Sequence, residues 1–182
     1  MSDALRLVTA EQLFKYPESK RYDLVRGEPQ VREPPGGLHG RLAARLATRL
    51  GHHVEQHGLG TVLVEAGYVL RTAPDTVRGP DVSFISGARM PPDQIPERFI
   101  PGAPDLAVEV LSPGSRWPEV EEVLADYFAS GARVVWVVVP RQRRIVVRYP
   151  DRPPEILAGN DFLDGGEVVP GFYLGLVDLF GV

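Results

Sequence analysis

The chain has 182 residues, a net charge of −4 at neutral pH and no cysteine. The length suits one domain with a sizeable core, so we expect a single domain over residues 1–182. The composition excludes disulfide frameworks, thiolate metal sites and cysteine nucleophiles, and the acidic balance restricts any nucleic-acid site to a local patch.

Targeting signals are not evident. The N-terminus lacks a basic segment followed by an apolar run, so we expect no signal peptide. Apolar stretches stay well below the roughly 20 residues of a membrane helix. We therefore expect a cytoplasmic protein that does not enter a membrane.

The first third of the chain predicts two helices around a hairpin. Thr9 and Gln12 have the spacing of a capping box, which predicts a short helix to about residue 14. Leucines then recur every four residues from Leu38 to Leu50, which is the spacing of one buried helix face. The expected elements are the short helix, strands at 22–25 and 30–32, and a long helix at 38–57.

The remainder predicts a mixed sheet. Apolar segments of strand length alternate with glycine- and proline-rich turns, and one amphipathic helix lies between them. We expect strands at 61–70 with a break at Gly67, at 82–85, 106–111, 134–139 and 145–149, a helix at 118–130, and short strands in the tail. This order predicts an α/β fold with a mixed sheet flanked by helices, an additional N-terminal helix and hairpin, and C-terminal strands.

Two acidic residues stand out against the predicted strands. Asp81 begins one strand, and Glu109 lies inside another that is otherwise apolar. An ionised glutamate there is costly unless a cation or hydrogen-bond donors meet it. If the strands are neighbours, both carboxylates can hold one hard cation such as Mg²⁺. The alternatives for Glu109 are an arginine partner or a helix N-terminus. Asp105 lies roughly 13 Å along the strand from Glu109, too far to share an ion.

At these residues the chain resembles the PD-(D/E)XK nucleases, and more narrowly the bacterial Uma-two-type family of restriction-endonuclease-like proteins. The matching segments are residues 22–28, His39, 79–85, 104–113, 124–132 and Trp136.

The resemblance implies a restriction-endonuclease-like fold and Mg²⁺- or Mn²⁺-dependent cleavage of DNA, by a protein that is plausibly a homodimer. It implies Asp81 and Glu109 as metal ligands and Glu28 as a third catalytic acid. It also places His39 near the acidic cleft, where it would bind substrate or make a local hydrogen bond at the helix start.

The pattern departs from the family at its lysine. The two positions where such a lysine is expected hold Leu111 and Val123. Arg116, in the loop after Glu109, or Lys20 could supply the missing charge and bind the substrate phosphate, although Arg116 could equally be a solvated loop residue. Two hypotheses stay open: a DNA endonuclease with a degenerate site, and a catalytically impaired relative that acts as a nucleic-acid-binding or assembly module.

Overall fold

The structure is a computed structural model that describes residues 7–181, without the side chain of Lys20. Its largest sheet has six strands in the order β11-β10-β9-β8-β6-β3. Strands β8 and β9 run parallel, and the other neighbours are antiparallel. In that order the strands are β11 (Glu155–Ala158), β10 (Arg144–Arg148), β9 (Val134–Val139), β8 (Leu106–Val110), β6 (Val82–Ser86) and β3 (Gly60–Val64).

A second sheet of five strands has the order β2-β1-β5-β4-β7. Its strands are β2 (Glu28–Val31), β1 (Tyr22–Val25), β5 (Thr76–Arg78), β4 (Tyr68–Arg71) and β7 (Ile100–Pro101). The smaller elements are helix α1 (Ala10–Phe14), the paired strands β12 (Phe162–Asp164) and β13 (Tyr173–Gly175), helix α4 (Leu176–Phe180), and 3₁₀ turns η1 (Ser19–Arg21), η2 (Pro92–Gln94) and η3 (Pro140–Gln142).

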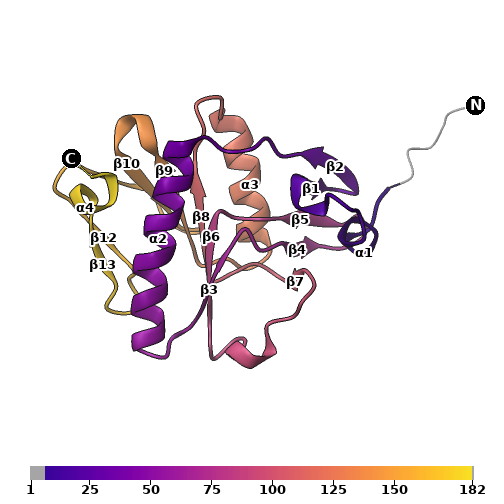
Figure 1. Cartoon of the computed structure of the whole chain (residues 1–182), viewed down its shortest axis with the longest axis horizontal. Helices are drawn as coiled ribbons and strands as arrows, with labels where there is room; N and C mark the ends of the chain where they lie inside the picture. The colour runs from indigo at the N-terminus through magenta and orange to yellow at the C-terminus, as the bar shows by residue number, and fades with distance from the viewer. Residues whose placement is uncertain (1–6, 182) are drawn as a thin grey trace, which may run out of the picture.

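Two long helices cover opposite faces of the six-stranded sheet (Figure 1). Helix α2 (Gly37–Gln56) buries the face formed by Leu42, Leu46, Leu50 and Val54. Helix α3 (Trp117–Ala129) buries Val120, Leu124 and Tyr127 on the other side. Both helices present an apolar stripe at helical spacing, which is why each packs against the sheet.

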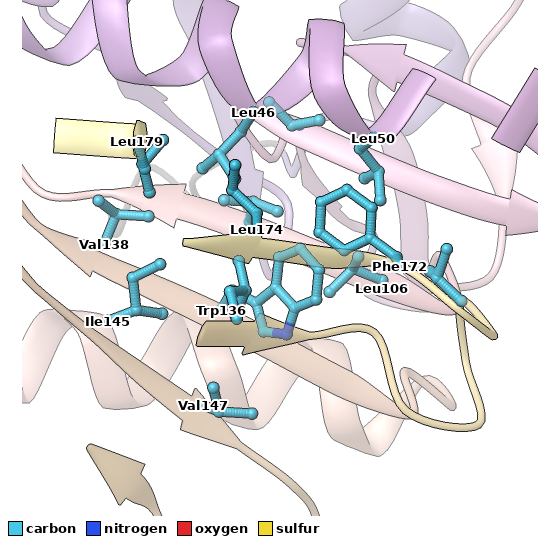
Figure 2. Packing of buried hydrophobic residues seen from close by; sticks show 14 of the residues in the cluster. Leu46, Leu50, Leu106, Trp136, Val138, Ile145, Val147, Phe172, Leu174 and Leu179 are labelled. Carbon is cyan, nitrogen blue, oxygen red and sulfur yellow. The ribbon is translucent and has the colours of Figure 1, made fainter. Parts of the chain in front are cut away.

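The core beneath α2 is closed by the C-terminal segment. Figure 2 shows Leu46 and Leu50 of α2 above Trp136, with Phe172 beside them. The rings of Trp136 and Phe172 are stacked, with centroids 5.8 Å apart. Helix α4 is also tied to α2, since the Arg45 guanidinium donates to the carbonyl oxygen of Leu179 at 2.8 Å. The tail therefore completes the layer that covers this face.

Strand β8 separates the two cores by simple alternation. Leu106, Val108 and Val110 belong to the cluster under α2, whereas Ala107 belongs to the cluster under α3. Because successive side chains of a strand point to opposite faces, Glu109 must share the α3 face with Ala107. This alternation was expected from the sequence and is confirmed.

The expected mixed sheet flanked by helices is confirmed, and most predicted elements lie within two residues of their expected limits. Strands β5 and β7 were not predicted, because three- and two-residue strands carry too little pattern to be detected. Leu176–Phe180 forms helix α4 after the short strands of the tail. Across residues 7–181, none of the helices is long and apolar enough to cross a membrane.

Candidate active site

Asp81 and Glu109 are brought together by strand pairing. Strands β6 and β8 are antiparallel neighbours, with Val82 opposite Val108. Continuing this register by one residue sets Asp81 opposite Glu109. Residues directly opposite in an antiparallel pair project from the same face, a few ångströms apart. The two acids therefore meet although 27 residues separate them in the chain.

Asp81 is held by one hydrogen bond on each carboxylate oxygen. Only 5% of the residue is exposed. Its Oδ2 accepts a hydrogen bond from the backbone N–H of Val110 at 2.6 Å, and its Oδ1 lies 2.9 Å from Nε2 of His39. His39 stands in the first turn of α2, so the start of that helix reaches the sheet here. Both oxygens of this buried carboxylate therefore have a hydrogen-bond partner, as buried polar groups require.

The surroundings of Glu109 shift its pKa strongly upward. Burial and then the negative charge of Asp81 raise the pKa of Glu109 from 4.5 to about 8. Its Oε1 accepts a hydrogen bond from the Tyr127 hydroxyl at 2.7 Å. Burial and the charge of Glu109 in turn raise the pKa of Tyr127 well above its ordinary 10. The phenol is therefore a fixed donor at neutral pH, and it orients the carboxylate.

This pair of carboxylates fits a divalent cation. A cation between them would offset both causes of the raised pKa of Glu109, its burial and the negative charge of Asp81. Within residues 7–181, no group of three or more His, Cys, Asp or Glu side chains is placed to hold a metal ion. Magnesium does not need such a cage, because it binds through one or two carboxylates, waters and substrate phosphate.

The two acids open into a cleft of about 760 Å³ at one end of the sheet. The start of α2 and the loop between β8 and α3 lie at this same end (Figure 1). Residues that line the cleft include Arg21, Arg32, Glu33, His39, Glu65, Asp81, Glu109, Leu111, Arg116, Glu119 and Val123. A cleft that combines paired carboxylates with arginines suits an anionic substrate bound through a cation.

Arg116 and Lys20 were the two residues expected to supply the missing positive charge. Arg116 lines the cleft, but it is exposed and pairs with Glu119, with Nε donating to Oε1 at 3.0 Å. Both positions of the absent lysine, Leu111 and Val123, also line the cleft. The side chain of Lys20 lies outside the described residues. The apolar replacements therefore stand at the site itself.

Glu28 does not join the other two acids. It is exposed, it stands opposite Val25 at the start of β2, and the described residues that line the cleft do not include it. Glu28 lies on β2, the outer strand of the five-stranded sheet, and its role as a third catalytic acid stays a prediction. Asp23 on β1, unlike Glu28, acts on the paired acids, since its negative charge contributes to the raised pKa of Glu109.

Sequence reasoning missed a layer of buried charge beneath the cleft. Arg78 on β5 is 6% exposed and bridges two acids, donating to Asp126 Oδ2 at 2.8 Å and to Asp23 Oδ2 at 3.2 Å. Burial lowers the pKa of Arg78, but the charges of the two aspartates outweigh it and raise the pKa overall. Arg32 extends the layer, with its Nε 3.8 Å from Asp23 Oδ1. These residues come from separate elements, so no local pattern links them.

Comparisons with known proteins agree with this geometry. The chain is similar in fold to the crystal structure of "a putative nuclease belonging to DUF820 from Anabaena variabilis", with a TM-score of 0.83 and 19% sequence identity over 95% of this chain and 97% of the other. No curated protein matches the chain. The family model of Uma2, described as "Putative restriction endonuclease", matches residues 10–177. The chain, with its paired acids at the mouth of a nuclease-like sheet, thus belongs to the Uma2 family of restriction-endonuclease-like proteins.

Proposed function

We propose that the protein is a metal-dependent DNA endonuclease in which Asp81 and Glu109 hold Mg²⁺ or Mn²⁺. The observation that supports this most directly is the position of Asp81 opposite Glu109 on neighbouring strands, where both acids line one cleft. Two acids that face one another in a cleft are an arrangement that functional sites use to hold a divalent cation. Membership of a restriction-endonuclease-like family supports DNA as the substrate.

The reaction would add water across one phosphodiester bond, breaking a P–O bond to leave a phosphate monoester and an alcohol. A bound divalent cation would polarise the phosphate and lower the pKa of the attacking water. His39 would position the carboxylate of Asp81, from which it lies 2.9 Å. Tyr127 would do the same for Glu109 through its hydroxyl hydrogen bond. Arg116 at the cleft rim would bind substrate phosphate after releasing Glu119.

A second function has one observation in its favour. Apolar side chains occupy both positions of the expected lysine, and both positions face the cleft. Losing one charge-stabilising group of this kind commonly lowers a rate by about 10²–10³-fold. A catalytically impaired protein that binds nucleic acid, or serves in an assembly, is therefore the alternative.

Plasmid nicking in Mg²⁺ or Mn²⁺ tests the first function. Wild type is expected to nick the plasmid, and Asp81→Asn and Glu109→Gln are expected to abolish nicking because each removes a negative charge without changing side-chain shape. Glu122→Gln is the matched control, since Glu122 is exposed on α3. Nicking that persists in Asp81→Asn would refute the proposed site. Sedimentation of the purified protein tests the accompanying proposal that a homodimer cuts the two strands.

A further inference from the structure

The cleft contains a cation that the family pattern does not place there. We propose that Arg32 contacts the substrate phosphodiester and stabilises the charge that develops on it, in place of the lysine absent from positions 111 and 123. The inference rests on the proposed function and names the residue that completes the same site. It concerns a phosphate-binding group of the chain itself, next to the paired carboxylates.

Arg32 is well placed for this role. It lines the cleft together with Asp81 and Glu109, and its side chain is 30% exposed, so it reaches solvent without lying free in it. An ideal Cβ built on Gly79 would lie 2.8 Å from Nη1 of Arg32. The tip of the guanidinium therefore lies against the backbone two residues before Asp81, and the missing side chain of Gly79 leaves the room for it.

Charge balance distinguishes Arg32 from the other arginines of the cleft. Arg21 and Arg116 are exposed and each pairs with an acid on its own turn, Glu18 and Glu119 respectively. Arg32 instead lines the cleft with Asp81 and Glu109, and its Nε lies 3.8 Å from Asp23. Burial lowers its pKa, but the charges of Asp23, Glu109 and Asp81 raise it overall.

The layer beneath holds Arg32 without neutralising it. Asp23 lies 3.8 Å from Nε of Arg32, but it also accepts a hydrogen bond from Arg78. Asp23 is thus shared, and Nη1 of Arg32 lies against the backbone of Gly79, two residues before Asp81. Guanidinium remains charged at all working pH values and binds phosphate with two parallel donors. Its contribution is therefore electrostatic rather than proton donation.

The decisive experiment moves the positive charge between positions. Arg32→Gln is expected to lower kcat about 10²–10³-fold with a smaller change in KM, because the lost group acts mainly on the transition state. Arg32→Lys keeps most of the activity. Adding Val123→Lys to Arg32→Gln restores cutting by supplying the charge from the helix. Arg141→Gln, an exposed arginine in the turn after β9, is the matched control and stays within about twofold of wild type.

Two further measurements separate this role from a structural one. The dependence of DNA affinity on salt, measured in Ca²⁺, should lose about one phosphate contact in Arg32→Gln and none in Arg32→Lys. Gly79→Ala, which pushes the guanidinium aside, should lower kcat in the wild-type background but not in Arg32→Gln. Melting temperatures of all variants control for folding.

Each outcome points to one conclusion. If Arg32→Gln cuts at nearly the wild-type rate with an unchanged salt dependence, the role of Arg32 is refuted while the nuclease function stands. If wild type is silent but Val123→Lys cuts, Arg32 does not replace the lysine, although the two acids form a working site. If neither protein cuts, the proposed function fails, and the role of Arg32 fails with it.

Discussion

The protonation state of Glu109 gives a prediction that does not depend on any activity. Glu109→Gln replaces the carboxyl by a neutral amide of the same shape, whose oxygen can still accept the hydrogen bond from Tyr127. The folded protein holds a proton on Glu109 up to a pKa of about 8, whereas the unfolded chain releases it near 4.5. The contribution of this group to stability is therefore fully present below about 4.5 and is lost as the pH rises through 8.

The size of the effect follows from the same values. A pKa raised from 4.5 to about 8 corresponds to at most about 5 kcal/mol, at about 1.4 kcal/mol per pH unit. Glu109 is only partly buried and lines the cleft, so water reduces this figure. We expect the stability of Glu109→Gln relative to wild type to increase by about 2–3 kcal/mol as the pH rises from 5 to 8 in the absence of divalent cations.

Urea unfolding of both proteins at pH 5 and pH 8 in a chelator measures this difference. The two proteins differ only at position 109, so the difference between their stabilities isolates Glu109. Mg²⁺ or Mn²⁺ at pH 8 should stabilise wild type more than the variant, because the cation binds the ionised pair. Glu122→Gln is the control and should stay within about 0.5 kcal/mol at both pH values. The reasoning would be refuted if the stability difference between Glu109→Gln and wild type were the same at pH 5 and pH 8, or if the variant were less stable than wild type at pH 8.

Three other changes test the surroundings of the site. Tyr127→Phe should lower the free energy of unfolding in urea by about 1.5–3 kcal/mol above pH 8, where the hydroxyl donates to a charged acceptor. In a thermal-shift assay, a cation should stabilise this variant less than it stabilises wild type. Arg78→Gln should cost about 2–4 kcal/mol by the same unfolding measurement, because it removes a buried guanidinium and leaves two half-buried acids without their shared partner. Leu46→Ala should cost about 2–5 kcal/mol and leave cation binding unchanged, since it removes packing against the sheet far from the carboxylates. A loss below about 1 kcal/mol for either of the last two would contradict the burial on which it rests.

Most of the fold could be predicted because its long elements have a clear period. The leucines of α2 recur with helical spacing, and the side chains of β8 alternate between the two cores as those of any strand do. The same alternation placed Glu109 on the face opposite to Val108. Strands β5 and β7 were missed because these short segments carry no strand pattern of their own and are strands only through their pairing with β4. Pairing depends on segments that only tertiary contacts bring together.

The candidate site divides in the same way. The sequence by itself singled out Asp81 and Glu109, because an acid in or beside an apolar strand conflicts with burial unless something compensates its charge. It also identified the positions where the expected lysine is absent. The family resemblance added Glu28, which lies on the outer strand β2 and is not among the described residues that line the cleft, so its role stays a prediction.

Only the tertiary structure decided which charges surround the two acids. Arg32, Arg78 and Asp126 come from a loop, a three-residue strand and a helix, and each looks like an ordinary surface residue in its own segment. Their ion pairs span 48 and 55 residues or cross between elements, so no local period records them. Periodicity determines which face a residue takes, whereas electrostatic partners are determined by which faces meet when the sheets close.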